Sequence, residues 1–110
     1  MLPRKKRATV PAVLRGRPKT LYASPSFIVK GVRNAVGYGR FGVVVSLGVD
    51  RRATRRHMLK RIVLNAARSF PPSFSLDLIF ILGRHSTELS RAALHEEVLK
   101  TLGKVSRQFP

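Results

Sequence analysis

Residues 40–68 read RFGVVVSLGVDRRATRRHMLKRIVLNAAR and contain the two elements that decide the fold. The valines of Phe41–Ser46 favour a β-strand, because β-branched side chains suit a pleated surface. Asp50–Arg68 has neither proline nor glycine, and its apolar residues recur on one stripe at helical spacing. The stripe consists of Leu59, Ile62, Val63 and Ala66. The opposite side carries His57, Lys60, Arg61 and Arg68. We therefore expect a strand followed by a basic amphipathic helix.

The flanking segments complete an α+β pattern. Ser26–Val32 alternates like a strand, and the glycine-rich Gly31–Gly39 predicts a turn, so the two strands would form an antiparallel hairpin. Leu76–Leu82 is an apolar run interrupted only by Asp77, which is typical of a strand covered on both faces. Ser90 can cap a final helix. The apolar stripe of that helix is Leu94, Val98, Leu102 and Val105. This order predicts a two-layer α+β sandwich.

We expect one domain, residues 1–110, because the length suits a single core. Residues 1–22 are basic, and Pro3, Pro11 and Pro18 limit any helix there to a short piece around Ala12–Arg15. We interpret 1–22 as a basic N-terminal arm or short helix.

The charge of the chain points to a polyanionic partner. Lys and Arg number 22 against five Asp and Glu, a formal net charge of +17, and 17 of the 22 lie in residues 1–76. So large an excess repels itself unless a polyanion neutralises it, and nucleic acid is the obvious one.

Six cations within eleven residues mark the candidate contact. They are Arg51, Arg52, Arg55, Arg56, Lys60 and Arg61. Such a density can bind backbone phosphates, and the alternative is a solvated charged face. The alternative is weakened because acids four residues away that would neutralise the cluster are missing.

The sequence shows no catalytic constellation and no metal site. Cysteine is absent, and His57, His85 and His95 have no paired carboxylate motif. The glycines of 31–37 lack the context of a nucleotide-binding loop. No export signal or membrane-spanning stretch is visible, so the cytoplasm is the expected location.

Alternation along the two strands predicts a second surface. The core face would take Phe27, Val29, Phe41, Val43 and Val45. The opposite face would take Ile28, Lys30, Arg40, Gly42, Val44 and Ser46. Its small residues would let an extended nucleic-acid strand lie close to the sheet, although an ordinary exposed face explains the pattern equally well.

Together these residues resemble the bacterial ribonuclease P protein family. Arg40–Ser46 matches a strand of the form R-x-G-x-x-x-S, and Arg56–Arg61 is similar to the helix that follows it, with an Arg-Asn-Arg motif and a Lys-Arg pair. Leu2-Pro3, Ser24-Pro25 and Leu89-Ser90 also look like this family, so the resemblance covers nearly the whole chain.

The chain departs from the family pattern at several positions. In the Arg-Asn-Arg motif His57 replaces the asparagine and Met58 the second arginine, while Leu64 and Asn65 stand where Arg and Glu are usual. Leu47-Gly48 replaces a basic pair, and an aromatic pair of the first helix is missing. The added Arg51, Arg52 and Arg55 would preserve RNA binding.

The resemblance implies an α-β-β-β-α-β-α sandwich in which a central basic helix packs on a small mixed sheet, a class shared with a ribosomal-protein domain. It also implies a left-handed crossover through that helix, which periodicity cannot supply. Our reading finds only three strands, so a fourth would come from Gly31–Gly39 or from division of the other runs.

The resemblance further implies a function in tRNA maturation. In this family the RNA subunit hydrolyses precursor tRNA with Mg²⁺, which enters through the RNA subunit and substrate, and the protein is non-catalytic. Its partners would be the catalytic RNA and precursor tRNA, with no membrane and no obligate protein partner. The expected RNA-binding residues are Arg51, Arg52, Arg55, Arg56, His57, Lys60, Arg61 and Arg68. The expected residues for the 5′ leader of the precursor are Ile28, Lys30, Arg40, Val44 and Ser46.

Two other classes fit the composition. A ribosomal or ribosome-associated RNA-binding protein would be equally small and basic. A DNA-binding module is less favoured, because only His57 and Asn65 on the basic helix are suited to reading base edges.

Overall fold

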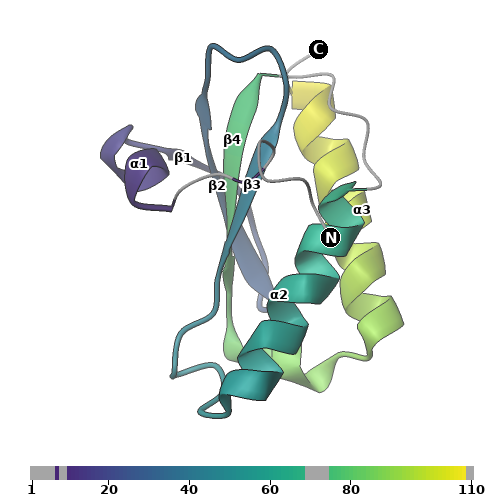
Figure 1. Ribbon diagram of the computed structural model, residues 1–110. Helices are drawn as coiled ribbons and strands as arrows, with labels where there is room; N and C mark the ends of the chain where they lie inside the picture. The colour runs from purple at the N-terminus through teal and green to yellow at the C-terminus, as the bar shows by residue number, and fades with distance from the viewer. Residues whose placement is uncertain (1–6, 8–9, 69–74, 109–110) are drawn as a thin grey trace.

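The computed structural model describes residues 7, 10–68 and 75–108. A four-stranded sheet has two long helices on one face and a short helix on the other (Figure 1). In chain order the elements are α1 (Val10–Arg15), β1 (Lys19–Ala23), β2 (Phe27–Arg33), β3 (Arg40–Val44), α2 (Ala53–Arg68), β4 (Leu76–Leu82), the 3₁₀ turn η2 (Arg84–Glu88) and α3 (Arg91–Gln108). The expected α-β-β-β-α-β-α order is confirmed.

The strand order is β1-β2-β4-β3, with β4 antiparallel to β2 and parallel to β3. The expected hairpin between β2 and β3 is therefore wrong, because β4 lies between them. β4 is the most apolar strand. Because it lies inside the sheet, between β2 and β3, both of its edges are paired and both of its faces are covered. α2 forms the crossover that two parallel neighbours require. The hairpin is formed instead by β1 and β2.

The fourth strand, β1, begins within residues 1–22 and ends at Ala23; it does not come from Gly31–Gly39. The interpretation of that whole segment as an arm is wrong at its end, where β1 begins at Lys19. An irregularity in the β1–β2 register between Thr20 and Tyr22 lets both Leu21 and Tyr22 pack against the core, so the strand lacks simple alternation. The Gly31–Gly39 stretch ends β2 and then turns, with Gly37 at φ +83°.

The hydrophobic core lies between the sheet and the pair α2 and α3. Phe27, Phe41 and Phe80 from three strands are almost fully buried there with Val63 and Leu102 from the helices. The core-facing alternation predicted for β2 and β3 is confirmed. On the other face, α1 contacts β3 and β4.

Hydrogen bonds from backbone N–H groups to side chains mark the starts of both long helices. α2 begins three residues later than predicted, because the Asp50 carboxylate accepts a hydrogen bond from the backbone N–H of Arg52 at 2.9 Å, a turn that holds the chain outside the helix. Ser90 accepts one from the N–H of Ala93 at 3.1 Å, which confirms the predicted cap. None of the helices in the described ranges combines the length and apolar character needed to cross a membrane.

Candidate nucleic-acid interface

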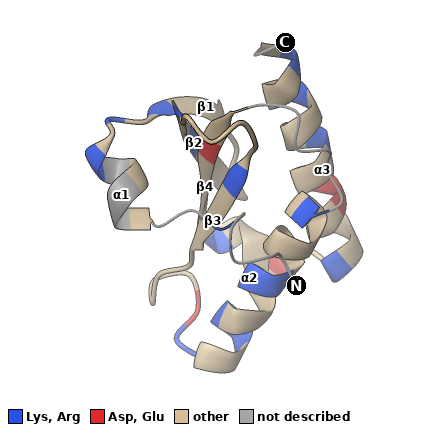
Figure 2. Ribbon diagram, turned by 45° about the horizontal axis from the view of Figure 1, so that its top comes forward, with Lys and Arg blue, Asp and Glu red and all other residues tan. Residues whose placement is uncertain are grey.

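The expected RNA-binding residues all lie on α2 or in the two positions of the loop just before it. Figure 2 shows Lys and Arg in blue along this part of the chain. Arg51, Arg52, His57, Arg61 and Arg68 are exposed. The other three, Arg55, Arg56 and Lys60, are half-buried. We call these eight residues the helix surface.

Asp50 organises the N-terminal end of the helix surface. Its carboxylate pairs with Arg52 at 3.1 Å and with Arg55 at 3.6 Å. Hydrogen bonds from the side chain and then the backbone N–H of Arg52 lower the pKa of Asp50 to about 2. The prediction that no acid neutralises the cluster is therefore wrong for these two arginines. A search four residues away misses Asp50 because Arg52 and Arg55 lie two and five residues after it.

Arg56 is held by backbone carbonyls rather than by a carboxylate. Its Nη1 donates to the carbonyl oxygens of Asp50 at 3.1 Å and Arg51 at 2.8 Å. Within the described ranges no acidic side chain pairs with Arg51, Arg61 or Arg68. These three exposed cations are the freest to meet phosphates.

Four of the five expected leader-binding residues lie by strand register on the face of the sheet opposite the core. Strand register places Ile28 beside Ile81 and Ile81 beside Val44. The next row is Lys30, Ile79 and Gly42. We call these two rows the outer sheet face. Ser46 lies two residues beyond the end of β3, so strand register does not place it on this face.

Arg40 lies in the third row of the same face, but it is occupied within the protein. Its Nε and Nη2 donate to the two carboxylate oxygens of Asp77, both at 2.7 Å. These hydrogen bonds raise the pKa of the Arg40 guanidinium above its ordinary value. The register of β3 against β4 sets Arg40 directly beside Asp77. Of the two cations expected on this face, Lys30 is the one that carries unpaired charge in the described structure.

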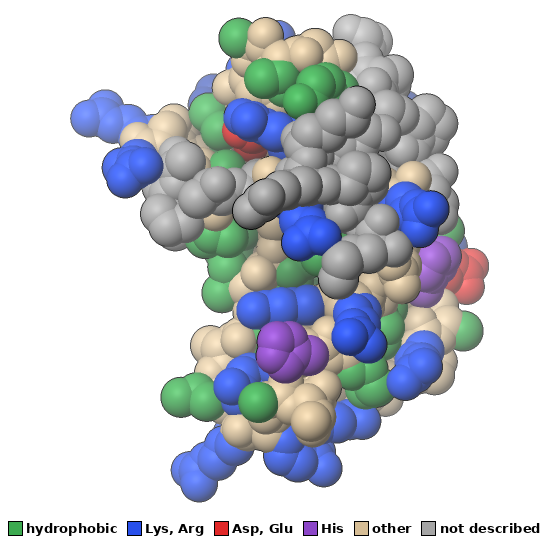
Figure 3. All heavy atoms as spheres, in the orientation of Figure 1, with side chains coloured by type: hydrophobic (Ala, Val, Ile, Leu, Met, Phe, Trp, Pro, Cys, Tyr) green, Lys and Arg blue, Asp and Glu red, His purple; other side chains and the backbone are tan. Residues whose placement is uncertain are grey.

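α1 covers one end of this face. Val13 is 2% exposed, and the backbone of Gly16 at the end of α1 lies against the side chain of Val32. Figure 3 shows the molecule hollowed between the region of α1 and the start of α2 below it. Ile28 at the open end of the face is 37% exposed.

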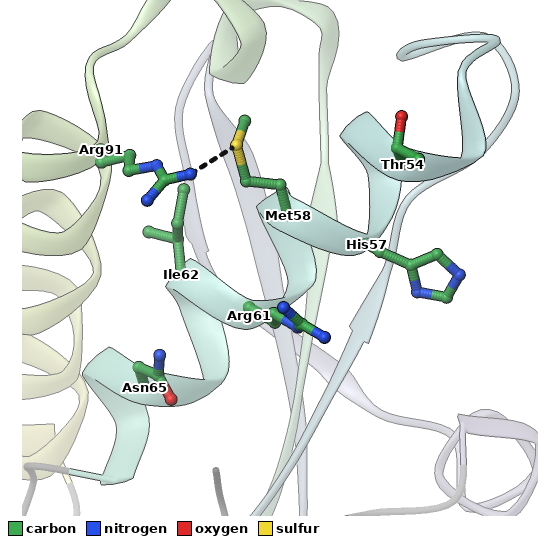
Figure 4. Close-up of a pocket in the computed structure, with 7 residues that line it drawn as sticks. All are labelled: Thr54, His57, Met58, Arg61, Ile62, Asn65 and Arg91. Atoms are coloured by element: carbon green, nitrogen blue, oxygen red, sulfur yellow. Dashed lines mark hydrogen bonds between the residues drawn. The ribbon is translucent and has the colours of Figure 1, made fainter.

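A separate groove lies between α2 and the start of α3. It has a volume of about 740 Å³ and is lined by Thr54, His57, Met58, Arg61, Ile62, Asn65 and Arg91. Figure 4 shows Arg91 reaching from α3 to Met58, with Ile62 beside the pair and His57 pointing the other way. Nη2 of Arg91 lies 3.2 Å from the sulfur of Met58.

A family model described as Ribonuclease P matches residues 5–106, almost the whole chain. The chain belongs to the ribonuclease P protein family. It is 36% identical over 95 residues to a ribonuclease P protein component from Azoarcus, covering 84% of this chain and 71% of that one. It is 33% identical over 100 residues to the component from Nitrosomonas europaea, covering 89% and 82%.

Solved ribonuclease P proteins share the fold. The protein from Thermotoga maritima superposes with a TM-score of 0.73 at 24% identity, covering 87% of this chain and 94% of that one. A Staphylococcus aureus ribonuclease P protein, a mutant with defective mRNA degradation activity, gives 0.75 at 19% identity, covering 90% and 89%.

The sequence reading missed three residues of this ribonuclease P family member that shape the candidate surfaces. Asp50 carried a recognisable signal, because an Asp at the first position of a predicted helix often accepts a hydrogen bond from a nearby backbone N–H and delays the helix start. Asp77, a lone acid in an apolar strand, could have indicated a buried ion pair. Arg91 carried no local signal, since its partner Met58 is 33 residues away in the chain.

Proposed function

We propose that this chain is the protein subunit of ribonuclease P, which binds the catalytic RNA through the helix surface and the 5′ leader of precursor tRNA on the outer sheet face. The proposal rests on one observation about a member of this family: its fold presents two separate surfaces with different chemistry. The helix surface is cationic. The outer sheet face is mostly apolar, and Lys30 is the one cation among its described residues without an acidic partner.

The helix surface suits the backbone of a folded RNA. Exposed arginines at both ends of α2 and in its middle can contact phosphates over the length of a 16-residue helix, roughly 24 Å. Phosphate contacts fix the register of a protein on a nucleic acid without reading its sequence. Such a surface positions the protein on a large structured RNA.

The outer sheet face suits a single strand. Unstacked bases bind to flat apolar surfaces, and the row of Ile28, Ile81 and Val44 offers one. In the next row Ile79 and Gly42 are buried, so the more exposed part of this face is the row of Ile28, Ile81 and Val44. Lys30, half-buried beside Ile79, can meet a phosphate of the strand.

We assign the hydrolysis to the RNA subunit, with Mg²⁺ held by the RNA and the substrate. Within the described part of the chain, no three acidic or histidine side chains lie together as metal ligands. The protein's contribution in this proposal is binding and positioning. It raises the local concentration of precursor at the RNA and orients the leader, which are established sources of rate acceleration.

Reconstitution tests the proposal. The protein, the ribonuclease P RNA of the same genome and a precursor tRNA are mixed at low Mg²⁺, and the 5′ end of the product is mapped. We expect cleavage at the mature 5′ end to increase with protein only when the RNA is present. Cleavage by RNA-free protein, or no stimulation together with co-purification on ribosomal RNA, would refute the proposal and favour the ribosomal alternative.

A further inference from the structure

The groove between α2 and α3 contains three of the residues at which the chain departs from its family's pattern. His57, Met58 and Asn65 all line it. Met58 stands where the family motif has an arginine. A cation of α3, Arg91, now reaches the same place from the other side. The departures thus change one continuous part of the surface.

The floor of the groove is apolar and its rim is cationic. Met58 and Ile62 are half-buried on α2, while Arg61 and Arg91 are exposed at the sides. None of the described residues that line the groove is acidic. The thioether that Arg91 contacts is a weak hydrogen-bond acceptor, so most donors of its guanidinium can bind another group. Among the described residues, no carboxylate pairs with either arginine.

An apolar floor with a cationic rim suits a ligand that has one flat apolar part and one anionic part. A nucleotide with an unstacked base has both properties, because bases pack on apolar side chains and on the guanidinium plane of arginine. The volume of about 740 Å³ is within the range of small-ligand pockets, roughly 300–1,000 Å³. An unmodified apolar peptide would leave the two arginines unpaired.

We propose that this groove binds one unpaired nucleotide of the catalytic RNA. The base lies on Met58 and Ile62 against the guanidinium of Arg91, and the adjoining phosphate meets Arg61. This inference rests on the proposed function and adds the start of α3 to the RNA interface. It also explains why Arg91, at the start of α3, contacts Met58 instead of a carboxylate.

Affinity measurements on matched variants test the cationic side. Arg91→Ala and Lys100→Ala each remove one cation from α3, but Lys100 pairs with Glu96 and does not line the groove. Titrated with the ribonuclease P RNA of the same genome, Arg91→Ala is expected to bind about tenfold more weakly and Lys100→Ala within about twofold of wild type. Equal losses would overturn the inference.

The apolar floor is tested without changing charge. Met58→Ala removes most of the contact and is expected to weaken binding by about three- to fivefold, whereas Met58→Leu keeps the volume and should bind like wild type. The slope of affinity against salt should be unchanged by Met58→Ala, because no phosphate contact is lost. Wild-type affinity for Met58→Ala would overturn the inference.

Chemical probing of the RNA locates the nucleotide. Wild-type protein should protect one or two consecutive unpaired nucleotides, and this protection should disappear with Met58→Ala and remain with Lys100→Ala. If the wild type binds the RNA and stimulates cleavage but both groove variants keep every protection, the groove inference alone fails. If the wild type does not bind the RNA, the proposed function fails and the groove inference fails with it.

Discussion

Arg40 and Asp77 form a two-point ion pair across the parallel strands β3 and β4. Nε and Nη2 of Arg40 each lie 2.7 Å from a carboxylate oxygen of Asp77, and Asn34 donates a further hydrogen bond to the same carboxylate at 2.8 Å. The Asp77 side chain is only 10% exposed. The pair therefore ties the turn after β2 and the start of β3 to the central strand, at the end of the sheet where α1 packs.

Removing the acid of this pair should destabilise the fold. Asp77→Asn leaves Arg40 without a counter-charge, and since Arg40 is itself partly exposed we expect about 2–3 kcal/mol, below the roughly 3–5 kcal/mol of a fully buried pair. Urea unfolding measures the loss. Glu96→Gln breaks the exposed pair with Lys100 and is the control, expected within about 0.5 kcal/mol of wild type. Equal stabilities of the two variants would contradict the structural role of Asp77.

The lowered pKa of Asp50 should make the stability of the protein depend on pH in the acid range. Its pKa is lowered from 3.8 to about 2 in the folded state, so the folded protein binds fewer protons than the unfolded chain between these values. The stabilisation is therefore present above pH 4 and is lost as the pH falls towards 2. Asp50→Asn keeps a side-chain oxygen that can accept the hydrogen bond from the Arg52 N–H but removes the charge. The difference in melting temperature between wild type and Asp50→Asn should shrink on acidification, and a constant difference from pH 6 to pH 2.5 would exclude this linkage.

Local patterns in the sequence were enough to predict the elements with strong periodicity. Leu76–Leu82 was predicted with the observed bounds, because a central strand must be apolar on both faces. The start of α3 followed from Ser90. β1 was missed because its register irregularity removes alternation. The pairing of β3 with β4 was missed because adjacent strands in sequence usually pair, and here the strand after the crossover inserts between them.

For the candidate site, the sequence was enough to predict which side chains are exposed wherever the type of side chain alone decides this. The cations of α2 had to lie outside the core, and alternation placed Ile28 and Lys30 on the outer sheet face. The pairing of Arg40 with Asp77 could not be predicted, because the two residues are 37 residues apart in the chain. The groove at Arg91 could not be predicted either, because it forms only where α2 packs against α3.

Salt should weaken the binding of the catalytic RNA steeply. If about five phosphates are engaged, the log–log slope of affinity against salt should lie roughly between −3.5 and −4.5. Arg51 and Arg68 are exposed and without an acidic partner in the described ranges, so replacing both with Ala should reduce the magnitude of the slope by about 1.4 to 1.8. Filter binding over a range of KCl concentrations gives the slope, and a value near zero for wild type would show that the charge does not bind the RNA.

The two proposed surfaces should separate by mutation. The double variant Arg51→Ala with Arg68→Ala removes two cations from the helix surface, so it should weaken binding of the catalytic RNA whatever the length of the leader. Lys30→Glu instead places a negative charge on the outer sheet face, where a leader phosphate is expected to pass. Its effect should appear only with precursors that carry several leader nucleotides, and assembly with the catalytic RNA should be almost unchanged.

Two titrations of each variant distinguish the surfaces. The first measures affinity for the catalytic RNA, and the second compares long-leader precursor with mature tRNA on the assembled complex. Lys30→Gln removes the positive charge without adding a negative one, so its loss with long-leader precursor should be smaller than that of Lys30→Glu because like-charge repulsion is absent. Circular dichroism establishes that each variant is folded, which is expected because all three positions lie outside the buried core. If the helix variant and Lys30→Glu show the same losses in both titrations, the protein presents one diffuse basic surface, and the separate assignment of the leader to the outer sheet face is wrong.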